Sequence, residues 1–337
     1  MILHYPYYTI EIVHAQLKFR FPFSIAHGTR THTDAVLCKL DFAGHTGVGE
    51  ATLPPYLPDT VEGVMAFLSS KELHHLLAQS ISKDFSPERI FDGIDKLMPG
   101  HMPAKAALDM ALWQLKAKIE NKTLTELLGV TSQNVVPHTY TIGISTRDEM
   151  REKIQFAETN GFSFFKLKMN GEDDENVLND FLALSTEPFA VDANQGWNDL
   201  QHAITFSTQL EESGCVLIEQ PFEKTDRQKS ATLMQSLHIP VIADEACQRI
   251  ADIDSIRGAF CGINIKLQKC GGLTEAMRMI THAKGLGLKT LIGCMSESSI
   301  GCGAAEALAP ICDWADLDGP WLIENNEEII QFENLRI

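Results

Sequence analysis

The chain has 337 residues, enough for one barrel domain of about 250 residues or fewer and a smaller second unit. Its hydrophobic content of 44% and charged content of 22% are ordinary for a soluble globular enzyme, and no apolar run approaches the ~18 residues of a membrane span. A formal net charge of −17 argues against a nucleic-acid partner, because phosphate binding needs a basic surface.

The N-terminal residues and the cysteines point to the cell interior. No basic segment followed by an apolar run and a small-residue cleavage site opens the chain, so we expect a cytoplasmic protein. The eight cysteines include no C-x-x-C pair, and their apolar surroundings favour reduced thiols. Composition leaves homo-oligomerisation open.

The first third of the chain predicts a small α+β unit. Residues 1 to about 45 alternate apolar and polar positions around a polar stretch, which indicates an antiparallel meander with a loop near 24–34. Helical spacing follows at about 60–70, 87–96 and 103–119, and Pro103 marks the start of the clearest helix.

From about residue 135, short β-type runs alternate with helical stretches. Eight runs predict strands: TYTIGI, FSFFKLKM, EPFAVDAN, CVLIEQ, PVIADE, CGINIKL, LKTLIG and DWADLD. The helices predicted between them lie at about 147–160, 173–186, 198–212, 225–236, 248–257, 272–286 and 297–309. This alternation requires a parallel sheet, which eight strands most naturally close into a barrel. The tail after 320 has no helical pattern, and we expect it to return to the small unit.

Three carboxylates each follow an apolar run: Asp192, Glu219 and Asp244. They recur at intervals of 27 and 25 residues (192 to 219, 219 to 244), about one strand plus one helix each. Barrel active sites are built at the C-terminal ends of successive strands, so these charges should converge. Each one alone fits a helix cap or a loop. Together, with water completing the shell, they suit a hard divalent cation such as Mg²⁺.

Two polar residues lie beside these carboxylates. Asn194 is two positions after Asp192, and Glu245 follows Asp244. Either they belong to the layer of groups that surrounds the metal ligands, or they are ordinary turn and cap residues.

Two lysine-bearing runs flank the carboxylates. In FSFFKLKMN, strand alternation puts Lys166 and Lys168 on one face. A solvated lysine face is the alternative, but barrel strands are covered on both faces. In GINIKLQK the same alternation selects Lys266 as the candidate and sets Lys269 aside. A metal between two lysines suggests removal of a proton from the carbon next to a carboxylate.

Several motifs resemble the muconate-lactonizing branch of the enolase superfamily. They are the K-x-K motif at 166–168, the D…E…D carboxylates, N-x-K-L-x-K-x-G-G at 264–272, GVGEA at 47–51 and DMALWQL at 109–115. The resemblance implies an α/β fold in which residues 126–320 form a (β/α)7β modified TIM barrel. Residues 1–125, joined by the tail 321–337, would form an α+β capping domain. We expect Lys168 and Lys266 to work on opposite faces of the substrate α-carbon and Lys166 to hold its carboxylate.

Two further segments are similar to dipeptide epimerases of this branch. ADLDGP at 315–320 matches their Asp-x-Asp motif, which implies that Asp316 and Asp318 hold the substrate α-ammonium. A solvated acidic turn is the alternative. GCMSESSIG at 293–301 also resembles these enzymes and implies that Met295 and Ser296 lie near the substrate peptide.

The resemblance also places the segment 21–34 over the barrel mouth, with Ile25, Gly28 and Tyr56 near the substrate. Gly28 stands where Ala-Glu epimerases have an arginine, although Arg30 is two residues away. A buried glutamate side chain without a cation would be costly, so we expect a hydrophobic C-terminal residue, in a dipeptide such as Ala-Val or Ala-Leu.

Other functions fit parts of this pattern. A muconate-type cycloisomerase or an o-succinylbenzoate synthase would use the same barrel, but neither needs the paired carboxylates Asp316 and Asp318. A Schiff-base aldolase has no use for three metal ligands. A non-catalytic barrel that binds carboxylates predicts a lost base or ligand, and this chain has lost none. The leading hypothesis is a Mg²⁺-dependent isomerase that acts on small dipeptides.

Overall fold

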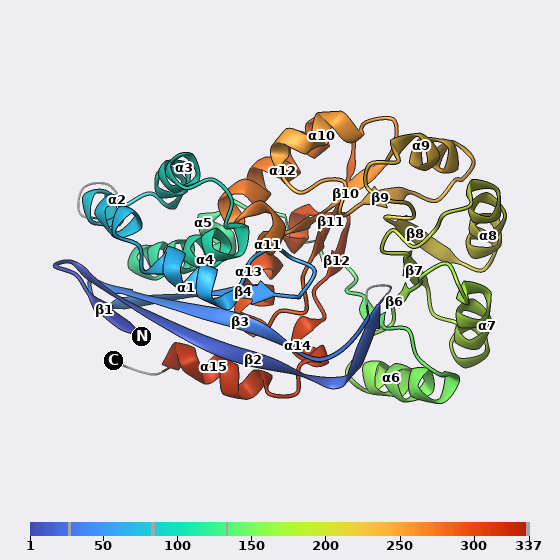
Figure 1. The fold of residues 1–337 in the computed structure, drawn as a ribbon, viewed down its shortest axis with the longest axis horizontal. Coiled ribbons are helices and arrows are strands. Elements are labelled where there is room, and N and C mark those ends of the chain that lie inside the picture. Colours follow the sequence, from blue (N-terminus) through green and yellow to red (C-terminus); the bar gives the residue numbers. More distant parts are fainter. Residues whose placement is uncertain (26–27, 82–84, 133, 335–337) are drawn as a thin grey trace.

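The computed structural model describes residues 1–25, 28–81, 85–132 and 134–334, which form a barrel and a separate layer that covers one side of it (Figure 1). Eight strands make one parallel sheet in chain order. The sheet closes where the Thr139 N–H donates to the Ala315 carbonyl at 3.1 Å. The strands are β5 Tyr140–Ile142, β6 Phe165–Lys168, β7 Phe189–Asp192, β8 Cys215–Glu219, β9 Val241–Ala243, β10 Gly262–Lys266, β11 Lys289–Gly293 and β12 Trp314–Asp316. All eight predicted strands are confirmed.

Helices surround these strands and cover their outer faces (Figure 1). Seven connect successive strands: α6 Arg147–Thr159, α7 Asp174–Leu184, α8 Leu200–Glu212, α9 Arg227–Gln235, α10 Ile250–Ile256, α12 Leu273–Gly285 and α13 Ser299–Glu306. All seven were predicted. Side-chain caps set several of their starts; the Thr146 hydroxyl, for example, accepts from the Glu149 N–H at the start of α6. Between the strands of the barrel two further short elements were not predicted: α11 Leu267–Cys270 and the 3-10 helix η1 Ala309–Ile311.

Strand alternation separates the core from the site. In β6, Phe165 and Leu167 face outward into a core cluster that includes Phe181 of α7. Lys166 and Lys168 therefore face the barrel interior, as predicted.

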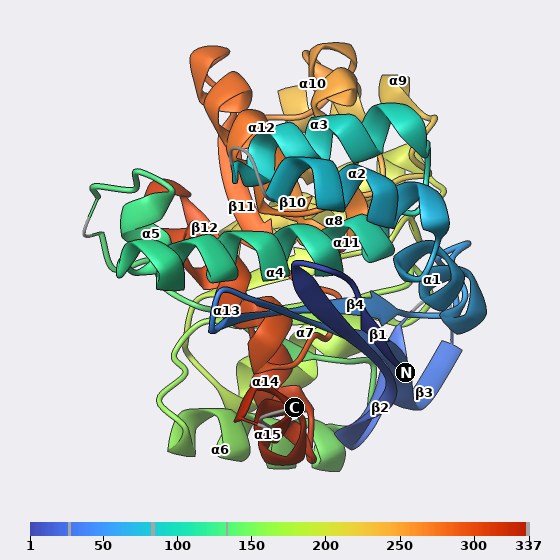
Figure 2. The ribbon, with the colours of Figure 1, turned by 90° about the vertical axis from the view of Figure 1, so that its left-hand side faces the viewer.

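The covering layer contains a four-stranded antiparallel sheet and the helices that pack on it (Figure 2). Gly47 and Gly49 of β4 allow the close approach of α4, because a Cβ at either position would lie 1.9 Å from a carbonyl oxygen of Ala111 or Ala107. The elements are β1 Ile2–His4, β2 Tyr8–Ile25, β3 Gly28–Phe42, β4 His45–Leu53, α1 Val61–Leu68, α2 Lys71–Ile81, α3 Pro87–Leu97, α4 Met102–Glu120 and α5 Leu124–Leu127.

For this layer the extent of one predicted loop was wrong, and the helices α2 and α5 were not predicted. The loop expected near 24–34 is much shorter, because β2 continues to Ile25 and pairs with Gly28 at the start of β3. Helix α2 was not predicted, although Leu73, Leu77 and Ile81 recur at helical spacing and are buried. The many polar residues between them concealed that periodicity.

The tail was expected to lack helix, and this was wrong. It contains α14 Gly319–Leu322 and α15 Asn326–Asn334, and α15 lies along the sheet (Figures 1 and 2). The Glu324 N–H donates to the Lys18 carbonyl at 2.8 Å, and Ile329 packs in a cluster with Leu37 and Val48. The tail therefore contacts the N-terminal sheet, while the boundaries 1–125 and 126–320 stay a prediction. Among the described residues no helix is long and apolar enough to cross a membrane.

Candidate active site

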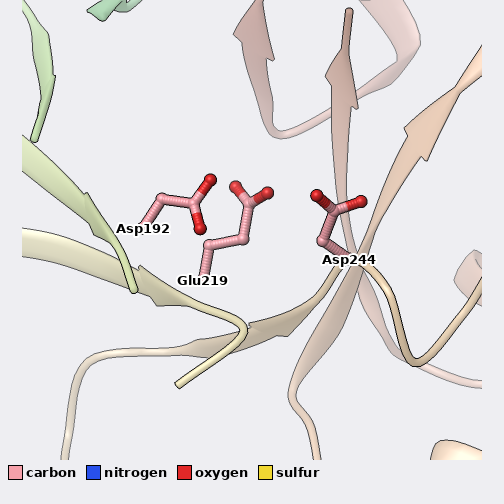
Figure 3. A group of neighbouring side chains, drawn as sticks. All are labelled: Asp192, Glu219 and Asp244. Carbon is pink, nitrogen blue, oxygen red and sulfur yellow. The ribbon is translucent and has the colours of Figure 1, made fainter. Parts of the chain in front are cut away.

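The three predicted metal ligands meet at the C-terminal ends of adjacent strands. Asp192 ends β7, Glu219 ends β8 and Asp244 follows β9 directly. Their side chains point toward one another (Figure 3), and one carboxylate oxygen from each lies within 4.8 Å of the other two. None is more than 3% exposed. Oxygen ligands at this spacing are the donor set of a hard divalent cation.

The charges of these three carboxylates favour the binding of a cation. Burial, and after it the charge of Asp192, raises the pKa of Glu219 to about 7. Burial would raise the pKa of Asp192 as well, but Lys168 and Lys166 outweigh it and lower that pKa. Oε2 of Glu219 is buried without hydrogen-bond geometry to any described partner and lies 2.8 Å from Nζ of Lys166. The residues present therefore fit a divalent cation.

Lys166 is buried among several carboxylates and neutralises part of their charge. Its Nζ is 2.7 Å from Asp316, 2.8 Å from Glu219 and 3.2 Å from Asp192. Burial lowers the pKa of Lys166, but these three charges outweigh burial and raise the pKa well above its ordinary value. Lys166 does not line the cavity described below, so its direct contact with a substrate carboxylate stays a prediction.

Lys168 and Lys266 face each other across the barrel. Lys168 ends β6 and Lys266 ends β10, and the three strands between them bear the carboxylates. Nζ of Lys168 is 2.6 Å from Asp192, and Nζ of Lys266 is 2.7 Å from Asp244. Burial lowers the pKa of Lys266, but Asp244 and Glu219 outweigh it and raise that pKa well above its ordinary value.

A cavity of about 280 Å³ opens above these groups. Its volume is at the small end for a ligand site. The predicted residues that line it are Lys168, Asp244, Lys266, Asp316, Asp318, Ile25, Tyr56, Met295, Ser296, Asn194 and Glu245. Gly28 is not among the lining residues, and residues 26–27 beside it lie outside the described part of the chain.

Asp316 and Asp318 lie on the side of the barrel opposite the carboxylate triad, where β12 meets β5. Asp316 accepts from the hydroxyl of Thr139, and Asp318 accepts from the N–H of Thr141 at 2.6 Å. Burial, and after it the charge of Asp316, raises the pKa of Asp318 to about 7. An ammonium group placed here would stabilise the ionised form of Asp318.

The cavity wall on the cap side is apolar. Phe23, Ile25 and Tyr56 lie there, and Met295, from the barrel segment after β11, adjoins Tyr56, with 3.5 Å between the Tyr56 hydroxyl and the Met295 sulfur. Arg30, the cation nearest the predicted arginine position, does not line the cavity. Its guanidinium lies over the rings of Phe19, Phe23 and Tyr56 at 5.4 to 5.8 Å and donates to Thr33 at 2.5 Å.

The structure adds site residues that the sequence did not reveal. Lys269, set aside as a base, is buried and contacts Asp244. Gln268 donates to Glu297 and to the backbone carbonyl of Glu50, linking the cap to the segment that contains Met295. Strand alternation does not describe Lys269, because β10 ends at Lys266 and α11 begins at Leu267.

Asn194 and Glu245 keep their two interpretations open. Each has a buried side-chain oxygen without a hydrogen-bond partner among the described residues, and both line the cavity. Asn194 also has a left-handed backbone with φ of 44°. Such backbone in a non-glycine residue is uncommon and is often found at functional sites.

Comparison with known families agrees with this geometry. Residues 7–129 match the N-terminal domain of the mandelate racemase/muconate lactonizing enzyme family, and residues 149–323 match the enolase C-terminal domain-like family. The chain belongs to this family of the enolase superfamily. The predicted family and the predicted fold class, a TIM-type barrel with a capping domain, are thereby confirmed.

The relatives to which this chain is similar include dipeptide epimerases. An L-Ala-D/L-Glu epimerase from Bacteroides thetaiotaomicron is 40% identical over 92% of this chain and 80% of its own length. A hydrophobic dipeptide epimerase from a Flavobacteria bacterium is 34% identical over 90% and 86%. The solved structure of an Enterococcus faecalis dipeptide epimerase, in complex with Mg and L-Leu-L-Tyr, has a TM-score of 0.82 at 26% identity, covering 94% of this chain and 91% of that one.

Proposed function

We propose that this protein is a Mg²⁺-dependent dipeptide epimerase that inverts the α-carbon of the C-terminal residue. The observation that supports this best is the way two opposed pairs of charged groups are placed around the cavity. The carboxylate triad faces Asp316 and Asp318 across the barrel, and Lys168 faces Lys266 across the other diagonal. A molecule with a carboxylate at one end and an ammonium at the other therefore fits with its α-carbon between the lysines.

Asp192, Glu219 and Asp244 would hold the cation. When bound, Mg²⁺ supplies positive charge that stabilises negative charge developing on the substrate carboxylate. Lys168 takes the proton from one face of the α-carbon, and the bonding electron pair moves toward the carboxylate. Lys266 then donates a proton to the opposite face, which inverts the configuration. The reverse reaction exchanges the two roles.

The side-chain preference we propose is for hydrophobic residues. The cap-side wall contains Phe23, Ile25 and Tyr56, with Met295 of the barrel beside them, while Arg30 is held among aromatic rings outside the cavity lining. Among the described residues of this wall a glutamate side chain would meet no cation, whereas an apolar side chain gains from burial. Relatives of both specificities exist, so the preference is decided by measurement.

The test is a panel of dipeptide stereoisomers incubated in D₂O and scored for deuterium at the α-carbon. Ala-Val and Ala-Leu should exchange with inversion, and Ala-Glu should be poor. A kcat/KM for Ala-Glu at or above that for Ala-Val would contradict the preference. No exchange with any dipeptide, but turnover of a muconate or a succinylbenzoate precursor, would contradict the function itself. A cytoplasmic location remains a prediction, and homo-oligomerisation stays open.

A further inference from the structure

A second buried lysine lies beside the candidate metal ligand Asp244 and also lines the cavity. Lys269 is in α11 and is 5% exposed. Its Nζ contacts Oδ1 of Asp244 and donates to the backbone carbonyls of Asp244 at 2.8 Å, Asn264 at 2.9 Å and Cys247 at 3.3 Å. An ammonium group has three protons, so these four oxygens occupy all of its donors. Lys269 has no donor left for a substrate.

The turn that contains Asp244 is held from two sides. Oε1 of Gln220, which follows β8, accepts from the N–H groups of Asp244 and Ala246, both at 3.0 Å. Lys269 binds the carbonyls of Asp244 and Cys247 from the other side. The backbone donors and acceptors of the turn are therefore fixed by different side chains. Of these two, only Lys269 also reaches the Asp244 carboxylate.

Lys266 contacts the same carboxylate in a different way. Its Nζ donates to Oδ2 of Asp244 at 2.7 Å, and this is its one hydrogen bond within the described residues. Both lysines line the cavity, but Lys266 alone of the two keeps donors that can turn toward a substrate. The two oxygens of Asp244 are therefore divided between a lysine fixed by four contacts and a lysine held by one.

We propose that Lys269 is a positioning residue that fixes Oδ1 of Asp244, so that Oδ2 is presented to the cation and Lys266 is free to act on the α-carbon. This inference rests on the proposed function, because it takes Asp244 as a metal ligand and Lys266 as an acid and base. Two effects of Lys269 oppose each other. Its charge repels a cation, while its contacts orient the ligand, and the proposal is that orientation dominates.

The first test measures Mg²⁺ affinity by calorimetry in the absence of substrate. Lys269→Met should bind Mg²⁺ about 10- to 100-fold more weakly, the usual effect of losing a group that orients a metal ligand. Lys105→Met is the matched control, because Lys105 is 1% exposed, forms an ion pair with Asp95 at 2.7 Å and lies in α4. The control should lose stability but keep its Mg²⁺ affinity. Folded Lys269→Met that binds Mg²⁺ equally or more tightly overturns the proposal.

Asp244→Asn separates this proposal from the proposed function. If Asp244→Asn keeps full Mg²⁺ affinity, the metal assignment itself fails. If it loses Mg²⁺ binding while Lys269→Met does not, only the positioning role fails.

A second test uses the natural protein, so it holds even if Lys269→Met does not fold. Crystal structures with and without Mg²⁺ and a dipeptide should show Nζ of Lys266 leaving Oδ2 of Asp244, while Nζ of Lys269 stays on Oδ1. Departure of Lys269 from Oδ1 on Mg²⁺ binding would overturn the proposal.

Discussion

The two walls of the cavity differ in almost every physical respect. The barrel wall is made from the ends of strands of three to five residues and bears buried charges such as Lys168, Asp244 and Asp316. The cap wall comes from the end of the 18-residue strand β2 and the loop after β4, and it presents Phe23, Ile25 and Tyr56. Charge at fixed positions suits chemistry at one carbon, while an apolar wall selects a side chain. We infer that reaction and specificity are separated between the walls.

Loss of a metal ligand should have the largest effect, because it removes charge stabilisation from the barrel wall. Asp244→Asn replaces a carboxylate with a neutral amide, and a loss of several kcal/mol corresponds to a kcat/KM lower by on the order of 10³-fold or more. The measurement is α-carbon deuterium exchange with Ala-Val, with circular dichroism as the control for folding. Full activity of chelator-treated wild-type protein without added metal would contradict the assignment.

The two lysines should each control one stereoisomer. Lys168→Ala and Lys266→Ala should lower epimerisation by on the order of 10²- to 10⁴-fold, because each removes one acid–base partner. Each variant should still exchange deuterium into one stereoisomer of Ala-Val, and the two variants should differ in which one. Unchanged exchange with both isomers after replacement of Lys266 rules out the two-base scheme.

Changes in the cap wall should alter selectivity and spare the chemistry. Arg30→Ala should leave the kcat/KM for Ala-Val within about threefold of wild type, because Arg30 lies outside the cavity lining. If wild-type protein epimerises Ala-Glu well and Arg30→Ala abolishes that activity, Arg30 takes the role of the missing arginine. That result would place an electrostatic contact on the cap wall. It would contradict the separation of reaction and specificity between the two walls.

The smallest effect concerns stability away from both walls. Asp109 in α4 is 2% exposed, accepts from the N–H of Thr274 at 2.8 Å, and has a pKa raised to about 7, chiefly by burial. Between pH 4 and 7 the folded state therefore keeps a proton that the unfolded state has released. The free energy of unfolding should fall as pH rises through this window, by up to a few kcal/mol, and then level off.

Asp109→Asn tests this pH dependence directly. The variant should lose less stability than wild type between pH 5 and pH 8, measured by denaturant unfolding in the presence of a chelator. Parallel stability curves for the two proteins would show that Asp109 does not titrate as described.

The barrel could be predicted from the sequence because its period is regular. Residues such as Asp192 and Glu219 end strands at intervals of one strand plus one helix, so chain position alone placed them together. The cap gave weaker signals. Its hairpin is long and partly polar, and α15 has only Ile329, Ile330 and Phe332 to mark an apolar face. Contacts such as that between Lys269 and Asp244 depend on a one-turn helix, which no periodicity reveals.

The junction of β5 and β12, where the barrel closes, has a consequence for the order in which parts of the molecule fold. The hydrogen bonds of Thr139 to Asp316 and of Thr141 to Asp318 each join residues 177 positions apart. During synthesis the chain emerges from its N-terminus, so β5 must wait for β12, and closing so long a loop is entropically costly. The proposed metal ligands, by contrast, come from neighbouring strands of the middle of the chain. We therefore expect refolding protein to recover Mg²⁺ binding before dipeptide binding.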